Sequence, residues 1–162
     1  MRFEPPTKKK MILIAMLALA LVGLFAASYL TWEHYSGNDV RCVIFEGCNT
    51  VLGSSHAVLF GLPVSLLGMI YYAGFLFLLL IYIIEKQKYA FWGACALVGA
   101  GFLFSLYFVY LQVFVINAIC FYCMVSAITT TLLFLLSGIL CNIDNKVCLP
   151  DRQARSPIFI KN

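Results

Sequence analysis

Two pairs of cysteines in this chain have spacings that suit thiol–disulfide chemistry. Cys120 and Cys123 form a Cys-x-x-Cys motif, CFYC, which opens a long apolar run, and Cys42 and Cys48 form a Cys-x5-Cys pair in a polar segment. Residues three apart share a helical face, and the dipole at a helix start favours the thiolate form of the first cysteine. We predict that Asn117 caps this helix, which would place Cys120 in its first turn. The alternative is that these cysteines are small packing residues.

The amino-acid composition is that of an integral membrane protein. Of the 162 residues, 63% are hydrophobic and 11% are charged, whereas about a quarter of the residues in soluble domains are charged. The mean hydropathy is +0.96. A helix that crosses the hydrocarbon core needs about 20 apolar residues, and the chain has room for four such helices. We therefore expect one all-α membrane domain, a four-transmembrane-helix bundle, and no nucleic-acid partner.

Four apolar runs define the expected organisation. The basic amino terminus, residues 1–10, leads into a run that is longer than the roughly 7 to 15 apolar residues of a signal peptide. The expected helices cover about residues 11–30, 63–84, 90–111 and 118–140. The nearly apolar connection before the fourth helix should keep CFYC at the lipid boundary. A tail, residues 141–162, follows the four-helix domain 11–140.

The segment 31–62 is the long mixed-polarity loop between the first two runs. Within it, Asn49 or Thr50 can cap a short helix that continues through Phe60 and is ended by Gly61. Such a helix is too short to span the bilayer. We expect it to lie along the membrane surface as a half-helix that covers the bundle.

Lysine and arginine are distributed unevenly among the connections. On an up-and-down path, the amino terminus, the turn at 85–89 and the tail share one side and hold ten of the eleven Lys and Arg residues, and only Arg41 lies on the other side. The positive-inside rule then places both termini in the cytoplasm and the 31–62 loop on the outer face together with CFYC. The two cysteine pairs therefore meet at one membrane surface, on the side where disulfides persist.

Two cysteine pairs on one surface can pass a disulfide by thiol exchange. A pair on a flexible loop and a pair on a fixed helix would make a relay, whose terminal oxidant we expect to be a quinone dissolved in the lipid. Phe121 and Tyr122 can wall an apolar pocket for its ring, together with aromatic residues of the third run, Phe102, Phe104, Tyr107, Phe108 and Tyr110. Such aromatics also serve as packing residues or interface belts. The loop pair can equally form a structural disulfide.

The histidines do not indicate a metal site. Zinc takes cysteine and histidine ligands, but His34 and His56 do not have zinc-finger spacing relative to the cysteines, and the loop carries no second Cys-x-x-Cys. We predict no metal ligands in this chain.

The chain resembles a known family. A loop Cys-x5-Cys followed by NTVLGSSHAVLFGLPVSLLGMIYY, with CFYC at the start of the fourth run, is similar to the prokaryotic form of the vitamin K epoxide reductase family over roughly residues 31–140. The resemblance implies a four-helix bundle around a quinone, such as ubiquinone or menaquinone. It also implies that electrons flow to the quinone from a thioredoxin-like partner.

The resemblance implies roles for individual residues. Cys42 and Cys48 match the loop cysteines that shuttle electrons, and Cys120 and Cys123 match the active-site pair, with Cys123 nearest the quinone. Which loop cysteine exchanges with Cys120 stays open. Ser54 matches a serine or threonine that the family uses near the active site, with the neighbouring Ser55 as the alternative.

Two departures from the family pattern affect the expected activity. Many prokaryotic members carry a fused thioredoxin-like domain, and this chain ends shortly after the fourth run, so we expect a separate thioredoxin-like (DsbA-like) partner on the outer face. Ala127 stands where the animal enzymes have a tyrosine, which favours quinone reduction over epoxide reduction.

Cys95, Cys141 and Cys148 have no family counterpart. We expect Cys95 to be a packing residue and the other two to face a reducing cytoplasm.

The resemblance thus favours a membrane thiol:quinone oxidoreductase that re-oxidises its partner for disulfide bond formation. One alternative is a disulfide oxidase of the DsbB type, which is also four-helical but carries its Cys-x-x-Cys near the first helices, the reverse of the order here. Another is a non-catalytic membrane subunit whose outer disulfide merely holds the loop.

Overall fold

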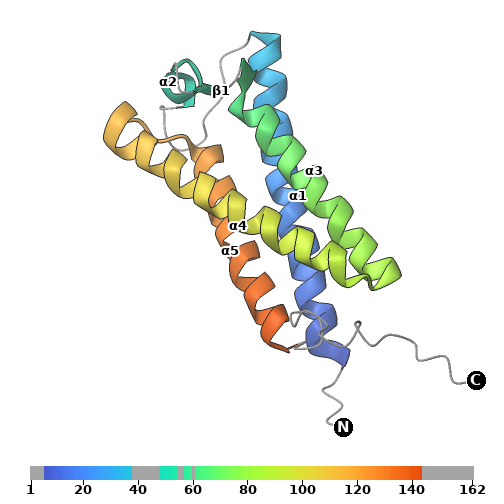
Figure 1. Cartoon of the computed structure of the whole chain (residues 1–162). Helices are drawn as coiled ribbons and strands as arrows, with labels where there is room; N and C mark the ends of the chain where they lie inside the picture. The colour runs from blue at the N-terminus through green and yellow to red at the C-terminus, as the bar shows by residue number, and fades with distance from the viewer. Residues whose placement is uncertain (1–5, 38–47, 55–56, 60, 144–162) are drawn as a thin grey trace, which may run out of the picture.

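The computed structural model describes residues 6–37, 48–54, 57–59 and 61–143. Within these ranges, four helices are long and apolar enough to cross a membrane: Lys8–Ser36, Val64–Glu85, Lys88–Ile116 and Phe121–Ile143. They run alternately up and down, so that the start of the first and the end of the last lie at the same end of the bundle (Figure 1). The expected four-helix membrane fold is confirmed.

Helix α1 (Pro6–Ser36) is longer than the expected 11–30. Its polar residues after Leu30 do not end it. The Thr31 hydroxyl donates to the carbonyl of Ala27 at 2.8 Å, so this polar side chain is satisfied within the helix itself. The helix ends at Gly37, whose φ of 66° is a left-handed conformation that glycine adopts without strain.

The expected surface half-helix exists, but it is shorter than predicted. Helix α2 (Cys48–Leu52) is followed by two short antiparallel strands, β1 (Val58–Leu59) and β2 (Leu62–Pro63). Gly61, which we expected to end the helix, lies in the turn between the strands with a φ of 80°. Tight two-residue hairpin turns require positive φ, which glycine supplies here, so the chain forms a hairpin where we predicted helix.

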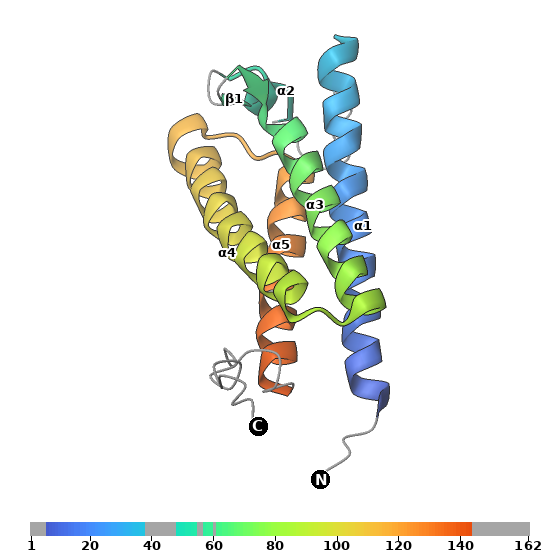
Figure 2. The same cartoon turned by 45° about the vertical axis from the view of Figure 1, so that its right-hand side comes forward.

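Helices α3 (Val64–Glu85) and α4 (Lys88–Tyr110) form an antiparallel pair with a tight turn. Lys86 adopts a left-handed conformation and donates its backbone N–H to the carbonyl of Tyr82 at 3.1 Å, which closes the end of α3. Helix α4 diverges from α3 toward the end of the bundle that carries α2 (Figures 1 and 2). Figure 2 also shows α1 running beside α3.

The connection 112–117 is helical, not an apolar turn as expected. Helix α4 continues into a π-helical segment, η2 (Leu111–Ile116), which ends where Asn117 takes a left-handed conformation and donates its backbone N–H to the carbonyl of Gln112. Helix α5 (Phe121–Ile143) begins three residues later than predicted. Asn117 therefore ends one helix and does not cap the next.

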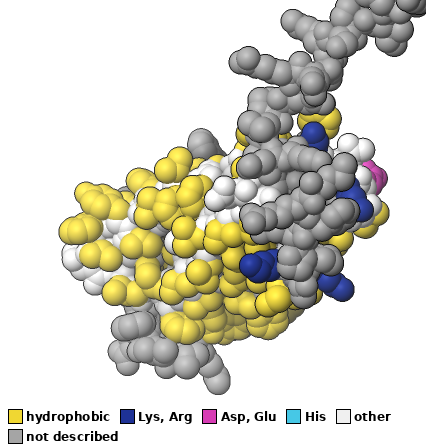
Figure 3. All heavy atoms as spheres, turned by 90° about the horizontal axis from the view of Figure 1, so that it is seen from below, with side chains coloured by type: hydrophobic (Ala, Val, Ile, Leu, Met, Phe, Trp, Pro, Cys, Tyr) yellow, Lys and Arg dark blue, Asp and Glu magenta, His cyan; other side chains and the backbone are white. Residues whose placement is uncertain are grey.

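The core of the bundle lies along the facing sides of the four long helices. Tyr72 and Phe75 of α3 and Leu133 of α5 are fully buried there. The described lysines, Lys8, Lys9, Lys10, Lys86 and Lys88, belong to the first turns of α1 and to the turn between α3 and α4. They gather at the end shown in Figure 3, and hydrophobic side chains cover much of the rest of the surface in view.

Candidate active site

CFYC lies at the start of α5, and Gln112 of η2 holds the backbone there by hydrogen bonds that both its side chain and its carbonyl accept. The backbone N–H of Cys120 donates to Oε1 of Gln112 at 3.0 Å, and the N–H of Ala118 donates to the Gln112 carbonyl at 3.1 Å. The Cys120 carbonyl accepts the N–H of Met124 at 3.1 Å, so Cys120 itself occupies the N-cap position of α5. With Asn117 as the expected N-cap, the sequence predicts Cys120 three residues deeper, in the first turn.

The loop cysteine Cys48 and the CFYC cysteine Cys120 are buried together. Both have 0% exposure, and they share a small hydrophobic cluster with Leu30 and Val51. Cys123 packs against the edge of this cluster. Cys48 is disulfide-bonded, whereas Cys120 and Cys123 are free thiols. Cys42, the other predicted loop cysteine, lies outside the described residues.

The thiol of Cys120 is acidic for a cysteine. A hydrogen bond from the Cys123 thiol is the main cause, and the backbone N–H groups of Cys123 and Tyr122 add to it. Together they outweigh the opposing effect of burial and lower the pKa of Cys120 to about 7. Hydrogen bonds to the charged form stabilise a thiolate, so Cys120 is the cysteine of the pair that is prepared to react as a thiolate near neutral pH.

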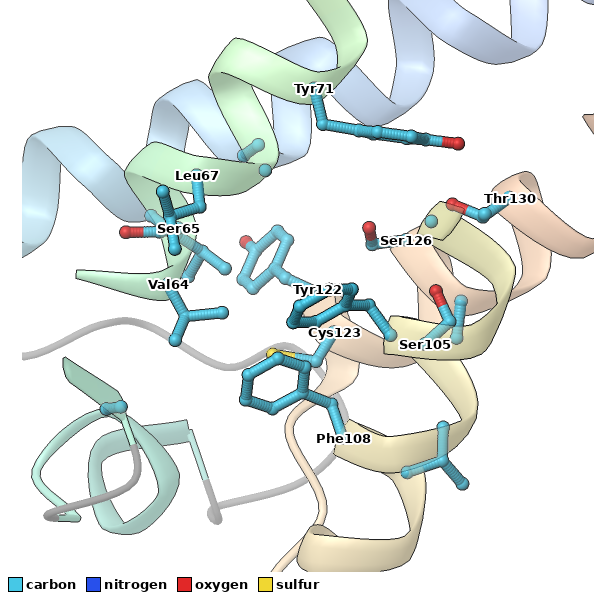
Figure 4. Close-up of a pocket in the computed structure, with 18 of the residues that line it drawn as sticks. Val64, Ser65, Leu67, Tyr71, Ser105, Phe108, Tyr122, Cys123, Ser126 and Thr130 are labelled. Atoms are coloured by element: carbon cyan, nitrogen blue, oxygen red, sulfur yellow. The ribbon is translucent and has the colours of Figure 1, made fainter. Parts of the chain in front are cut away.

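Cys123 lies on the wall of a cavity of about 400 Å³ between the helices. The cavity is bounded by α3, α4 and α5, with parts of α1, and the α2 segment covers it through Val51, Leu52 and Ser54. Figure 4 draws Cys123, Tyr122 and Phe108 among the residues that line this cavity. The lining is mostly apolar, and the volume falls within the roughly 300 to 1,000 Å³ of small-molecule sites.

Three residues predicted for cofactor binding lie on this cavity: Cys123, Tyr122 and Ser54. The Ser54 hydroxyl donates to the carbonyl of Val51 at 2.7 Å, which stabilises the turn after α2. Phe121 lies outside the cavity. It lines a separate hollow between α1 and α5, which Tyr122 also borders. Ser55, the alternative to Ser54, lies outside the described residues.

The aromatic residues of α4 divide between the cavity and other surroundings. Phe104 and Phe108 line the cavity. Phe102 stacks on Phe134 of α5 with ring centroids 4.8 Å apart, while Tyr107 and Tyr110 are more than half exposed. Phe102 is thus a packing residue, and the exposed Tyr107 and Tyr110 fit the alternative role of interface aromatics. Ala127 also lines the cavity.

Three cavity residues escaped sequence reasoning. Gln112 is 2% exposed and holds the backbone of Cys120. Tyr72 is 0% exposed, and its hydroxyl lies within 3.0 Å of oxygen atoms of Ser126, Thr129 and Thr130. Its neighbour Tyr71 lines the same cavity. The sequence did contain a signal for Gln112. It is a polar amide in the nearly apolar stretch before CFYC, and a buried polar side chain there needs a hydrogen-bond partner.

The cavity fits a quinone ring. A quinone is a flat, largely apolar molecule with polar carbonyl oxygens, and the cavity combines aromatic walls with a few hydroxyl groups. Two buried hydroxyls on its lining, those of Ser65 and Tyr71, have no hydrogen-bond partner within the described residues. Buried polar groups in proteins are nearly always paired. Cys123 contributes a thiol to the same cavity wall.

Comparisons with known proteins find a matching family and a curated relative. The family model described as Vitamin K epoxide reductase family matches residues 14–138. A relative, the thiol-disulfide oxidoreductase LTO1 of Arabidopsis thaliana, is 33% identical over 121 residues, which cover 68% of this chain and 31% of that protein. The chain therefore spans less than a third of the length of this relative.

Proposed function

This chain belongs to the vitamin K epoxide reductase family, and we propose that it is a membrane thiol:quinone oxidoreductase that re-oxidises a thioredoxin-like partner. The observation that carries the proposal is the position of the cysteines. Cys48 shares a buried cluster with Cys120, while Cys123 lines an apolar cavity. One pair of thiols thus has a protein disulfide on one side and a site for a flat ring on the other.

In the proposed cycle, the dithiol of the partner first reduces the disulfide between Cys42 and Cys48, and the partner leaves as a disulfide. The Cys48 thiolate then attacks the Cys120 sulfur of an oxidised CFYC, and Cys123 leaves as a thiolate. Attack by Cys42 on Cys48 releases Cys120 and re-forms the loop disulfide. Two electrons have then moved from the loop to Cys120 and Cys123. The burial of Cys48 beside Cys120 supports Cys48 as the loop cysteine that exchanges with it.

A quinone bound in the cavity supplies the acceptor for two electrons and two protons. Cys123 is the thiol beside the ring, and Cys120, whose pKa is about 7, closes the CFYC disulfide as the electrons leave. We propose Tyr122, Ser54 and Cys123 as residues of this site, and we leave Phe121 out because it lies outside the cavity.

The two alternative functions have less support. A DsbB-type oxidase carries its cysteine pairs in the reverse order, and the family match is to vitamin K epoxide reductases. A purely structural role for the loop disulfide does not explain why Cys48 is buried beside a second, reduced pair. The proposed orientation sets the cysteine pairs at the outer face, where a secreted DsbA-like partner can reach the loop.

The test is quinol formation by the purified protein with a reduced thioredoxin-like partner and a short-chain ubiquinone or menaquinone. We expect Cys123→Ala to reduce turnover to the rate without enzyme, because no thiol then faces the ring. Cys95→Ala is the matched control, since Cys95 is a free thiol of α4 that packs against the core and does not line the cavity. Unchanged turnover in Cys123→Ala, or equal loss in both variants, would contradict the assignment.

A further inference from the structure

Three buried side-chain oxygens in the described part of the chain have no hydrogen-bond partner, and all three belong to α3: Ser65 Oγ and the hydroxyls of Tyr71 and Tyr82. Ser65 and Tyr71 line the cavity beside Cys123, whereas Tyr82 does not. A hydroxyl that is buried without a partner loses its hydrogen bonds to water and gains none in return. Such groups at a ligand site indicate a partner that arrives with the ligand.

The ring of Tyr71 is held in place between two helices. It lies against Gly101 of α4, where an added Cβ atom would overlap the ring, and it packs edge-on against the Tyr72 ring with centroids 4.9 Å apart. The absence of a side chain at Gly101 leaves the space that the ring occupies. The position of the Tyr71 hydroxyl is therefore set by packing.

The hydroxyls of the two neighbouring tyrosines differ in their surroundings. The Tyr72 hydroxyl lies 2.9 Å from both Ser126 Oγ and Thr130 Oγ1, so it engages the polar groups that α5 presents to the cavity. The Tyr71 hydroxyl points toward Ser126 and Thr130 (Figure 4); it interacts with the Thr130 side chain, but no hydrogen bond of good geometry joins it to a described residue. Tyr72 thus links α3 to α5, whereas the Tyr71 hydroxyl at the cavity wall is not held by a well-formed hydrogen bond.

We propose that Tyr71 is a specificity-determining residue of the quinone site, whose hydroxyl donates a hydrogen bond to a carbonyl oxygen of the bound quinone. The inference rests on the proposed function, because it needs the cavity to take a quinone. The bond fixes which part of the ring faces Cys123, and it distinguishes a quinone from an apolar ring of the same shape. A site that supplies a matched donor discriminates against ligands that lack the acceptor.

The test compares binding of menadione, a naphthoquinone, with binding of 2-methylnaphthalene, which has the same ring system without the carbonyl oxygens. All proteins carry Cys123→Ala, so that no electrons are transferred, and dissociation constants are measured by equilibrium dialysis of the full chain in detergent. One hydrogen bond corresponds to an affinity change of about two- to tenfold. We expect Tyr71→Phe to weaken menadione binding by that factor and to leave 2-methylnaphthalene binding unchanged.

Tyr82→Phe is the matched control, because it removes an unpaired buried hydroxyl from the same helix outside the cavity. We expect it to bind both probes like the parent. Since Phe keeps the ring of Tyr71, the thermal midpoints of the two variants should not fall below that of the parent. With native cysteines, Tyr71→Phe should raise KM for the quinone and leave reduction of the loop disulfide by the partner unchanged.

Distinct results would overturn this inference and the proposed function. Equal menadione affinity in Tyr71→Phe and Tyr82→Phe, beside clear binding by the parent, would overturn the role of Tyr71 and leave the quinone site intact. If Tyr71→Phe weakened the binding of menadione and of 2-methylnaphthalene equally, the substitution would have changed the shape of the cavity. That result would also overturn the role of Tyr71. Failure of the parent to bind menadione would overturn the quinone site and, with it, this inference.

Discussion

The Cys120 thiol combines full burial with a pKa near 7, two properties that usually oppose each other. Burial disfavours a thiolate, but the hydrogen bond from the Cys123 thiol and two backbone N–H groups outweigh it. A thiol with a pKa near the ambient pH is the most effective in exchange, because it is both sufficiently ionised and sufficiently nucleophilic. In the proposed cycle this pKa makes Cys120 a good leaving group from the mixed disulfide with Cys48, and a good nucleophile when the CFYC disulfide re-forms as the quinone takes up the two electrons.

The titration of Cys120 gives a prediction at the residue scale. Because its pKa is lowered from 9.0 to about 7, its thiolate is present above pH 7 and is lost as the pH falls through 7. In Cys123→Ala the largest cause of the lowering is gone, so the midpoint should move upward, toward 9.0. The ultraviolet absorbance of the thiolate, recorded against pH and corrected with Cys120→Ser, measures both midpoints. The same midpoint with and without Cys123 would contradict this account.

The sequence predicts which cysteines belong to the candidate site, but it does not predict the residues that support them. Cys-x-x-Cys and Cys-x5-Cys spacings are local patterns, and charge asymmetry predicts that they share a side. Gln112 and Tyr71 act through contacts that no local pattern encodes: an amide oxygen that meets a backbone N–H eight residues along the chain, and a ring that fits against a glycine on another helix. Only the packed structure reveals these partners.

At the scale of elements, hydropathy predicts the long helices well and their ends poorly. Runs of about 20 apolar residues must be helical in a bilayer, because every backbone group must be satisfied internally. Where a helix ends depends on which local backbone conformation is most stable there, and hydropathy does not report this. The π-helical η2 is apolar apart from Gln112 and ends at the left-handed Asn117, and the β1–β2 hairpin replaces the last part of the predicted half-helix. Composition does not distinguish these local conformations.

The contact between α1 and α3 depends on a glycine, which gives a prediction at this scale. A Cβ atom on Gly23 would overlap the ring of Tyr72, and that ring cannot withdraw easily because its hydroxyl is bound to α5. We expect Gly23→Ala to destabilise the protein by about 1–3 kcal/mol, the usual cost of overpacking a core. Unfolding in a denaturing detergent series measures the loss.

Gly138→Ala is the control for this prediction, because a Cβ added at Gly138 of α5 would meet no atom within 4 Å among the described residues, apart from its own helical neighbours. In that variant, alanine's higher helix propensity should leave stability unchanged or slightly raised. Equal stability of Gly23→Ala and Gly138→Ala would contradict the close approach of α1 and α3 at this position.

At the scale of the whole molecule, the bundle has two chemically different ends. Within the described residues, all lysines lie at the end where α1 begins and α3 turns into α4, and CFYC and Cys48 lie at the other end. Each lysine near an anionic cytoplasmic leaflet contributes about 1 kcal/mol, so several together favour one orientation. Cys141, near the lysine end, is disulfide-bonded, although disulfides are rare in a reducing cytoplasm. Orientation therefore needs a direct measurement.

Two exposed tyrosines at opposite ends make this measurement possible. Tyr35, near the end of α1 on the CFYC side, is 67% exposed, and Tyr89, at the start of α4 on the lysine side, is 86% exposed. We expect a membrane-impermeant maleimide to label Tyr35→Cys in intact cells and Tyr89→Cys only after permeabilisation, with the unsubstituted chain giving the background. The reverse pattern would turn both cysteine pairs toward the cytoplasm. The relay would then serve a cytoplasmic thiol, and the proposed secreted partner would be wrong.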